Sequence, residues 1–309
     1  MKHTEIVVVN EAGIDVEIAQ RGRPSNVQRK RFPLDSGIPG VTLEFTYNFL
    51  REGYTTPRHR HNFDQIRYSL SGVHNTGVAD LMPGDCGYFP ESAYYGPQEQ
   101  KGDCVLLLLQ FQGPSGEPFL GNEAVNATFA RLLEKGAVFK DGVYTARKED
   151  GGKVNKDSYT ALWEESQGRP LKFSTPRYQQ PIIMNPDQFR WLDDAQNPGL
   201  RHRHLGTFTE LRTGVAMMQL MPGASIDAGT QVDAEIRYLT EGYAEYDGKE
   251  WGPNTYFFLP ASSHPKAISS SKGATFFSIS LPMLTELARE HSKGVAVTEG
   301  RPLEHNPSA

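Results

Sequence analysis

The stretch GYTTPRHRHNFDQIRYSLSG, Gly53–Gly72, decides the fold expected for this chain of 309 residues. It places His59 and His61 between a glycine turn and a run of β-branched and aromatic residues. On an extended strand, residues two apart point to the same face, so both imidazoles can reach one point. By the same parity, Gln65 and Arg67 are expected on that face, provided no bulge intervenes.

The same plan occurs twice, at a constant offset of 170 residues and without a gap. Its shared positions are Gly53, Ile66, Arg67, Tyr68, Gly72, Pro83 and Pro90, which match Gly223, Ile236, Arg237, Tyr238, Gly242, Pro253 and Pro260. Such repetition indicates one supersecondary unit used twice. The second copy carries Gly229 and Gln231 in place of the two histidines. We therefore expect one copy to hold a site and the other to support it.

Both copies have the rhythm of short antiparallel strands. Residues 42–112 are rich in β-branched and aromatic residues broken by turn formers, and residues 214–282 repeat this pattern. This predicts a mainly all-β protein with two barrels or sandwiches. Between them, the spacing of apolar residues predicts a helix over 123–135 that starts at an Asn122 cap, and a second short helix around Trp163.

These patterns divide the chain into five parts. We expect an N-terminal arm at 1–41, a first barrel at 42–113, a partly helical connector at 114–211, a second barrel at 212–283, and a C-terminal helix and tail at 284–309. Within the connector, the polar stretch ARKEDGGKVNKDS is predicted to be a surface loop. A second pair of histidines two residues apart, His202 and His204, does not coincide with the positions of the repeat. We expect it on the surface of a strand or linker.

Composition and charge exclude several partners. A net charge of −5 provides no basic field for nucleic acid or anionic lipid. The longest apolar run, Val105–Leu109, is far too short to span a membrane. The N-terminus does not read as a signal peptide, and the chain has only two cysteines, Cys86 and Cys104, so a cytoplasmic location is expected. The oligomeric state stays open, and a homo-oligomer is compatible with the sequence.

Two strings resemble the motifs of the cupin superfamily. Gly53–Gly72 is similar to motif one in every spacing, and GDCGYFPESAYY, which starts at Gly84, is similar to motif two with Pro90 in place. Because the resemblance occurs in both copies, it implies a bicupin with two tandem jelly-roll barrels, also called double-stranded β-helices.

Two positions depart from the family's metal ligands. Gln65 stands where the family has glutamate, and Tyr95 stands where it has a third histidine. Gln65 offers a carbonyl oxygen without charge, and Tyr95 can ligate only as a phenolate. The resemblance implies one divalent transition metal held by His59, His61, Gln65 and Tyr95. Fe(II) is the expected ion, and Mn, Ni, Cu or Zn also suit two imidazoles. A metal-free pair of histidines that only lines a pocket is the alternative.

The string PRHRHNFDQIRY, residues 57–68, is most similar within the superfamily to gentisate and salicylate ring-cleaving dioxygenases. Those enzymes carry an arginine at the place of Arg67 that meets the substrate carboxylate. The resemblance implies oxidation of a small aromatic or enolisable carboxylic acid, with Arg67 binding the acid in a bidentate fork and Tyr95 beside the reaction centre. Arg237 occupies the matching position in the copy that lacks the histidine pair. Arg67 could therefore form a structural salt bridge common to both barrels instead of binding a substrate. A metal-dependent lyase, isomerase or hydrolase and a non-catalytic small-ligand-binding bicupin also stay open.

Overall fold

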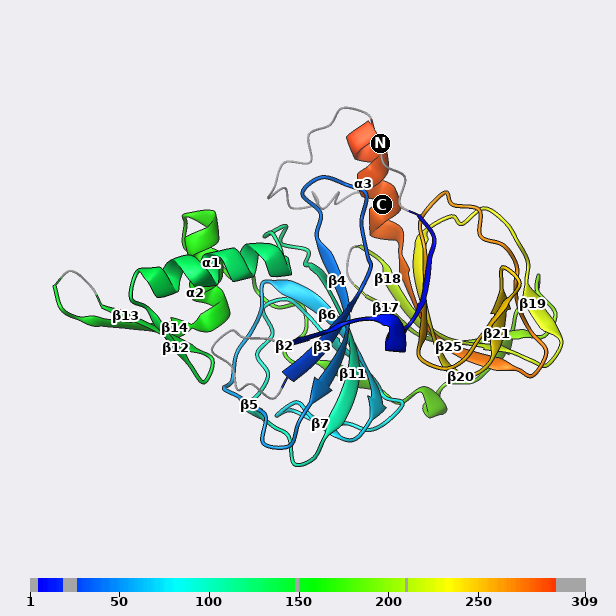
Figure 1. Ribbon diagram of the computed structural model, residues 1–309, viewed down its shortest axis with the longest axis horizontal. Helices are drawn as coiled ribbons and strands as arrows, with labels where there is room; N and C mark the ends of the chain where they lie inside the picture. Colours follow the sequence, from blue (N-terminus) through cyan, green and yellow to red (C-terminus); the bar gives the residue numbers. More distant parts are fainter. Residues whose placement is uncertain (1–4, 19–26, 148–149, 209–210, 293–309) are drawn as a thin grey trace. The chain divides into compact units, whose positions relative to one another are not determined.

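The computed structural model describes residues 5–18, 27–147, 150–208 and 211–292 (Figure 1). Contacts divide the chain into two compact units, and each of them contains one seven-stranded sheet. The first barrel unit is built from Val16–Arg31 and Thr42–Ile183. The second barrel unit is built from Phe32–Val41, the segment that ends at Asp15 and the segment that begins at Met184. None of the helices in the described stretches has the length and apolar character needed to cross a membrane.

In the first barrel unit the sheet order is β15-β9-β6-β11-β4-β3-β2. The strands are β2 Val16–Ile18, β3 Val27–Phe32, β4 Leu43–Leu50, β6 Phe63–Ser71, β9 Cys86–Phe89, β11 Cys104–Gln112 and β15 Ile182–Met184. Two short ladders complete the barrel, β5 Thr55–Thr56 with β10 Gln98–Glu99, and β7 His74–Asn75 with β8 Asp80–Leu81. The apolar run of β11 suits a central strand, because it pairs with β4 on one side and β6 on the other.

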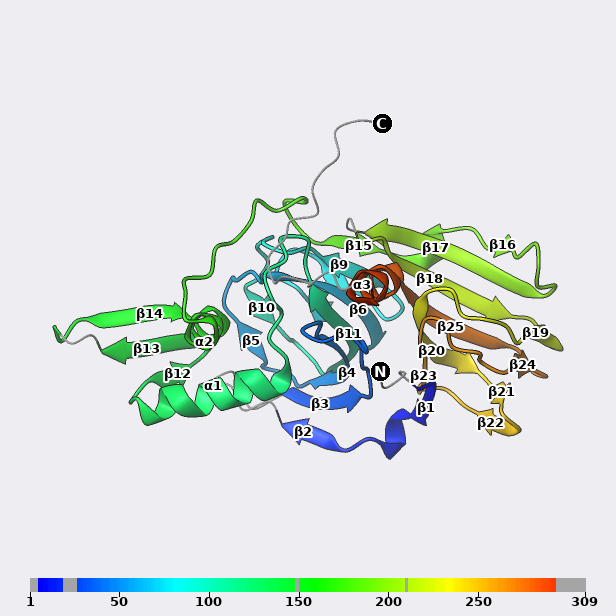
Figure 2. The same ribbon diagram turned by 90° about the horizontal axis from the view of Figure 1, so that it is seen from above.

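Two helices and a small sheet lie together on one side of the first barrel unit (Figures 1 and 2). They are α1 Asn122–Glu134, α2 Ser158–Gln167, β12 Val138–Lys140, β13 Val143–Arg147 and β14 Lys153–Asp157. The helix predicted over 123–135 is confirmed within one residue. Its predicted cap is wrong, because Gly121 is the N-cap and the backbone N–H of Asn122 donates to Glu44 Oε1 at 2.6 Å.

The predicted surface loop at 146–158 is also wrong in part. Its two ends belong to the strands β13 and β14, which pair antiparallel from Val143 with Asp157 to Arg147 with Lys153. Residues 148 and 149 lie outside the described residues. Tyr144 packs against the apolar cluster of the neighbouring helices, whereas the other residues of β13 and β14 are partly or fully exposed and mixed in character. The sequence therefore lacked the alternation of apolar and polar residues that reveals a half-buried strand.

The second barrel unit has the sheet order β1-β23-β20-β25-β18-β17-β16. Its strands are β1 Val7–Asn10, β16 Leu192–Asp193, β17 Leu200–Phe208, β18 Thr213–Leu220, β20 Ala234–Gly242, β23 Thr255–Leu259 and β25 Ala274–Leu281. A second sheet contains β19 Ala224–Ile226, β24 Ile268–Ser270, β21 Ala244–Tyr246 and β22 Lys249–Trp251. The helix α3 Pro282–Ser292 follows β25, as predicted. The histidines His202 and His204 lie on β17 as partly exposed and exposed residues, which confirms their reading as strand surface.

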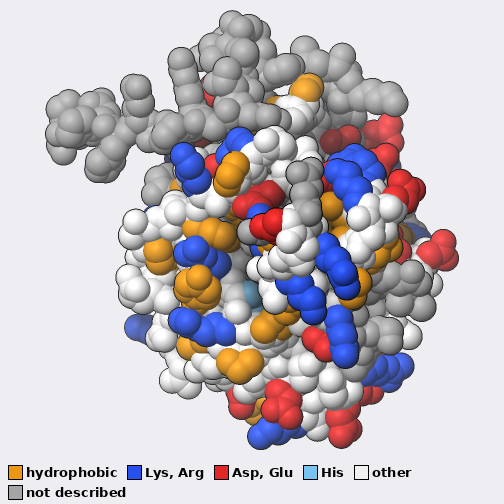
Figure 3. Space-filling view, turned by 90° about the vertical axis from the view of Figure 1, so that its left-hand side faces the viewer, with side chains coloured by type: hydrophobic (Ala, Val, Ile, Leu, Met, Phe, Trp, Pro, Cys, Tyr) orange, Lys and Arg blue, Asp and Glu red, His pale blue; other side chains and the backbone are white. Residues whose placement is uncertain are grey.

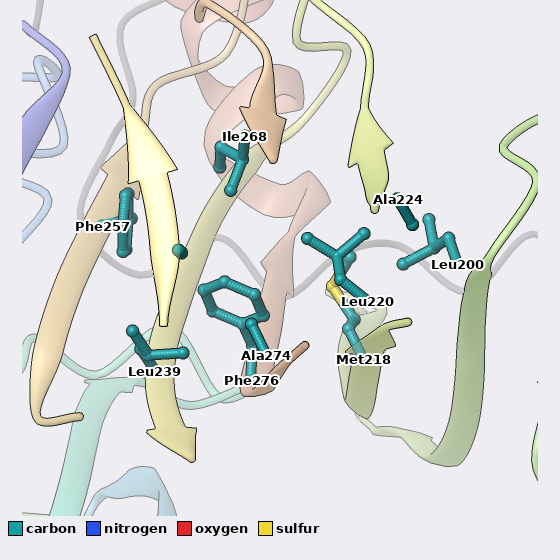
Figure 4. Packing of buried hydrophobic residues seen from close by; sticks show 10 residues of the cluster. Leu200, Met218, Leu220, Ala224, Leu239, Phe257, Ile268, Ala274 and Phe276 are labelled. Atoms are coloured by element: carbon teal, nitrogen blue, oxygen red, sulfur yellow. The ribbon is translucent and has the colours of Figure 1, made fainter. Parts of the chain in front are cut away.

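The core of the second barrel unit is a continuous apolar cluster between its sheets (Figure 4). Its members are Leu200, Met218, Leu220, Ala224, Leu239, Ala244, Phe257, Ile268, Ala274 and Phe276. Phe276 is fully buried, so its replacement by alanine is expected to cost about 3–5 kcal/mol of folding free energy.

The internal repeat is a repeat of structure as well as of sequence. In the first barrel, the backbone N–H of Ser92 donates a hydrogen bond to the carbonyl of His61 at 2.8 Å. In the second barrel, the N–H of Ser262 donates the equivalent bond to the carbonyl of Gln231 at 2.7 Å. Gly72 shows the same equivalence. A Cβ there would lie 2.1 Å from the carbonyl oxygen of Asp103, and one at Gly242 would lie 2.1 Å from that of Gly273. Only glycine fits such an approach, which explains why both copies keep it.

Candidate functional site

The segment Pro57–His61, which precedes β6, brings both histidines to the interior of the first barrel. His59 is bridged to Tyr95 by two backbone hydrogen bonds of 3.0 Å. The carbonyl of His61 accepts the N–H of Ser92. The segment is not a regular strand, but these bonds hold it extended along the 92–95 loop. His59, His61 and Tyr95 are all buried as a result.

The two imidazoles and the phenol meet at one point. The Tyr95 hydroxyl oxygen lies 3.0 Å from His59 Nε2 and 2.9 Å from His61 Nε2. His59 Nδ1 lies 2.7 Å from the carbonyl oxygen of Pro57. Because a carbonyl can only accept, Nδ1 carries the proton and His59 Nε2 presents its lone pair to Tyr95. We call these three side chains the His-Tyr triangle.

Arg67, on β6, contacts this triangle from the side. Its Nη2 donates to the Tyr95 oxygen at 2.8 Å and to Gln65 Oε1 at 2.6 Å, and its Nε donates to Gln65 Oε1 at 3.0 Å. Its Nη1 donates to His74 Nε2 at 2.9 Å. Four of the five N–H groups of a guanidinium are therefore engaged, all by neutral acceptors. Only one Nη1–H is left for a substrate, so the bidentate fork expected from the sequence is already occupied.

The charge of Arg67 is not balanced within the described residues. The side chain is 6% exposed and forms no ion pair there. The second barrel differs, because Arg237 at the equivalent position pairs with the carboxylate of Glu235 at 2.7 Å. Gln65 is the counterpart of Glu235, so one amide in place of one carboxylate leaves a buried cation in the first barrel. Burying an unpaired charge is costly, which favours an anion as the ligand here.

Gln65 lines the same cavity, but its oxygen points to Arg67. Both lone pairs of Oε1 accept from the guanidinium, and the residue is 2% exposed. Its role as a metal ligand stays a prediction, because a metal would have to replace one of these two bonds. In the observed arrangement, Gln65 positions Arg67.

His74 is a site residue that the sequence analysis missed. It is 1% exposed, and burial together with the Arg67 charge holds the pKa of its imidazole well below the usual range. A neutral His74 accepts from Arg67 through Nε2, while its Nδ1 lies 3.1 Å from the Gln100 carboxamide. In the sequence it stands within a turn string, SGVHNTG, and its contact with Arg67 depends on the β7 and β8 ladder.

Two members of the triangle, His61 and Tyr95, border a cavity of about 130 Å³ inside the first barrel together with Arg67. Its walls are inward residues of β3, β4, β6 and β11, and its other side is closed by residues of the connector and helices, namely Phe119, Leu120, Val125, Ser158, Tyr159 and Leu162. On the face shown in Figure 3, Lys and Arg side chains and hydrophobic side chains surround a hollow in which a histidine is visible. The lining is thus mixed, because polar side chains lie at the triangle and also on β3, β4 and β11, among them Arg29, Glu44 and Gln110, between apolar ones.

The triangle fits a metal ion in spacing, and His59 also fits in tautomer. Metal to imidazole bonds are about 2.0–2.1 Å, so two neighbouring ligands at a right angle lie about 2.9 Å apart. The measured separations between the Tyr95 oxygen and the two Nε2 atoms agree with this. The Pro57 carbonyl orients His59 as partners of metal-bound histidines do. No cluster of three His, Cys, Asp or Glu side chains suited to a metal occurs in the described residues, so a metal held by His59 and His61 would need a donor of another kind, such as the phenol of Tyr95.

Comparison with known proteins supports the fold through structure alone. No protein-family model matches the sequence, and no curated protein matches it either. A candidate dioxygenase from Nostoc punctiforme superposes with a TM-score of 0.61 at 13% identity, over 89% of this chain and 82% of that one. A candidate glyoxylate-induced protein from Pseudomonas aeruginosa gives a TM-score of 0.57 at 13% identity, over 91% and 90% of the two chains. A deletion mutant of Bacillus subtilis oxalate decarboxylase gives 0.51 at 13% identity, over 89% and 76%.

These neighbours are cupin-fold proteins, and the two repeated barrels described above have the same jelly-roll architecture. The mainly all-β tandem fold predicted from the sequence is confirmed. The chain has the tandem cupin fold.

Proposed function

We propose that this protein is a metal-dependent oxygenase that oxidises a small carboxylic acid in the first barrel. The observation that carries the proposal is the convergence of His59 Nε2, His61 Nε2 and the Tyr95 oxygen at one point beside a cavity. Iron(II) is the ion we expect, because two imidazoles and one oxygen donor leave positions free for further ligands. The Nostoc neighbour, described as a candidate dioxygenase, lends support through its fold.

The buried charge of Arg67 indicates the class of substrate. Among the described residues its acceptors are Gln65, Tyr95 and His74, and none of these is a carboxylate. A substrate carboxylate would balance the charge and accept the remaining Nη1–H. Gln65 and His74 hold the guanidinium in place, so that it does not have to be ordered when the substrate arrives.

The cavity indicates the size of substrate. A cavity of about 150 Å³ lined by apolar side chains binds benzene, and the volume here is about 130 Å³. Its apolar wall includes Phe63, Phe119 and Leu108. One ring, or an enolisable acid of similar volume, fits beside the triangle.

The side chains around the cavity have different roles in the proposed reaction. Arg67 binds and orients the acid, and its Nη2–H donates to the Tyr95 oxygen, which would stabilise the phenolate form that could join His59 and His61 in holding a metal. Residues of α1 and α2 cover one side of the cavity and limit the access of water to it. When bound, the metal would supply a Lewis acid and, as iron, the electron exchange that dioxygen chemistry needs.

Oxygen uptake by Fe(II)-loaded protein tests this proposal. An oxygen electrode is used with a panel of hydroxybenzoates and β-dicarbonyl acids, and with their uncharged amides as controls. We expect uptake with one or more acids and little with the amides. Arg67→Lys should raise KM for the acid, because lysine cannot hold Gln65, Tyr95 and His74 together.

Two results would contradict the oxygenase. Turnover of an acid that proceeds equally well without oxygen would replace it with a metal-dependent lyase, isomerase or hydrolase at the same residues. Tight acid binding without any turnover would instead indicate a binding protein.

A further inference from the structure

Gln110, on β11, lines the cavity of the first barrel with a side chain that the protein does not use. Within the described stretches, neither the oxygen nor the nitrogen of its carboxamide makes a hydrogen bond. The residue is half-buried, and its carboxamide is not enclosed by protein atoms. The other carboxamides of the lining, on Asn48, Gln65 and Gln98, all form hydrogen bonds with protein groups. Gln110 thus offers two donor hydrogens and one acceptor oxygen to a ligand in the cavity.

The sheet register places Gln110 beside Arg67. On β11, Leu108 pairs with Arg67 of β6, and Gln110 pairs with Gln65. Gln110 and Arg67 are therefore diagonal neighbours on the inner face of the sheet, where such positions lie about 7–8 Å apart. The Arg67 guanidinium is bonded to the Gln65 oxygen, on the strand next to Gln110. One small molecule in the cavity can reach the guanidinium and the Gln110 carboxamide together.

The side chains around these two groups suit a ring. Leu108 is the inward residue of β11 that precedes Gln110, and Phe63 lies on β6; both are apolar and line the cavity. A ring that packs on them with its carboxylate at Arg67 can turn a position away from the carboxylate toward Gln110. A substituent next to the carboxylate would stay beside Arg67 instead.

The charges around Gln110 favour a neutral substituent over a second acid group. On β4, Glu44 pairs with Gln110, and its carboxylate already forms an ion pair with Arg31 at 2.7 Å. Arg29, another cation of the lining, donates to Asn48, which is four residues further along β4. Gln110 is itself neutral, so its direct neighbour on β4 adds no uncancelled positive charge. A carboxamide that both donates and accepts is matched by a hydroxyl group, which does the same.

We propose that Gln110 is a specificity-determining residue, which selects acids that carry a hydroxyl group away from the carboxylate. This inference rests on the proposed function, because it takes the acid to be held by Arg67. It narrows the substrate class from small aromatic acids to those with a distal hydroxyl.

Calorimetric titration of the metal-free full-length chain tests this selection. The ligands are benzoate and its 2-, 3- and 4-hydroxy derivatives, and the metal is left out so that a hydroxyl cannot gain affinity by coordination. We expect 3- or 4-hydroxybenzoate to bind about three- to tenfold more tightly than benzoate, which is the effect of one neutral hydrogen bond. Any preference for 2-hydroxybenzoate should not depend on Gln110.

Gln110→Leu provides the decisive variant, because it removes the polar atoms and keeps a side chain of similar size. The Kd for benzoate should stay close to its wild-type value, and the preference for the distal hydroxyl should be lost. Gln112→Leu is the matched control. Gln112 lies on the same strand outside the lining, where its Nε2 donates to the carbonyl of Gly116 at 2.7 Å. This variant should keep the preference.

Three results would overturn the role of Gln110. They are a preference that persists in Gln110→Leu, an equal loss of preference in Gln112→Leu, and equal binding of benzoate and both distal hydroxybenzoates by the wild type. In each case benzoate still binds, so the proposed oxygenase is unaffected. A preference that depends on Gln110, in a protein whose Fe(II) form consumes no oxygen, would refute the oxygenase alone. Binding of no acid on the panel would refute both.

Discussion

The guanidinium of Arg67 donates two hydrogen bonds to one oxygen of Gln65, at 3.0 Å from Nε and 2.6 Å from Nη2. In the second barrel the equivalent pair is Arg237 and Glu235, joined by an ion pair of 2.7 Å. The two barrels thus share a buried arginine and differ in whether its charge is cancelled. This difference is the basis of the first two predictions.

Gln65→Glu should give the first barrel the same buried arginine–glutamate pair that the second barrel has. The new carboxylate would cancel the Arg67 charge, so the Kd for acids should rise about tenfold or more. The free energy of unfolding should rise as well, by about 1–3 kcal/mol, because a buried cation gains a partner. Calorimetric titration and urea unfolding measure the two effects. Unchanged acid binding in a folded variant would show that Arg67 does not attract the ligand.

Glu235→Gln should have the opposite consequence for stability. It removes the only ionised partner of Arg237 in the described residues and should cost about 3 kcal/mol in urea unfolding. Ser278→Ala is the matched control, because it removes one hydrogen bond to Glu235 and leaves the ion pair, at a cost of about 1 kcal/mol. Equal losses in the two variants would mean that the ion pair contributes nothing of its own.

Metal content should reach at most one transition metal per chain. Within the described residues, only the first barrel presents two imidazoles and a phenol to one point, so His59→Ala should abolish binding measured by elemental analysis. Tyr95→Phe should weaken binding by about 10–100-fold, and any visible tyrosinate band of the iron(III) form should vanish with it. Two metals per chain would contradict this prediction, as would full occupancy in a variant that lacks both histidines.

The stability of the first barrel should depend on pH through Glu91. Burial raises the pKa of this carboxyl above its ordinary value of 4.5, and Oε1 has no hydrogen-bond partner among the described residues. The folded state then holds a proton that the unfolded state releases. The contribution of Glu91 is therefore fully present below pH 4.5 and is lost as the pH rises through the folded-state pKa.

Glu91→Gln removes this titration. Relative to wild type, the variant should gain stability as the pH rises, by about 1–3 kcal/mol at pH 8. Urea unfolding at pH 5 and at pH 8 gives the difference, with Glu99→Gln as the control because Glu99 is exposed. A difference between Glu91→Gln and wild type that is the same at both pH values would refute the assignment.

Much of the architecture follows from local patterns in the sequence. The spacing between Gly53 and Gly72, repeated from Gly223 to Gly242, was enough to predict two barrels. Gly72 and Gly242 are required by a close backbone approach within their own repeats, and Gly53 and Gly223 by a positive φ. The same pattern placed His59 and His61 in one barrel and Gly229 and Gln231 in the other. It did not predict the hairpin of β13 and β14, since these largely exposed strands show no regular alternation of apolar and polar residues.

The sequence by itself determined which barrel carries the histidines, because strand parity and an ungapped repeat are properties of neighbouring residues along the chain. Only the tertiary structure decided how these residues are used. It joined Arg67 to Gln65 and His74, brought the Tyr95 oxygen between the two imidazoles, and closed the cavity with Tyr159. These contacts depend on turns and helices far apart in the chain, and hydrogen bonds between side chains are set by the final packing, which no local periodicity encodes.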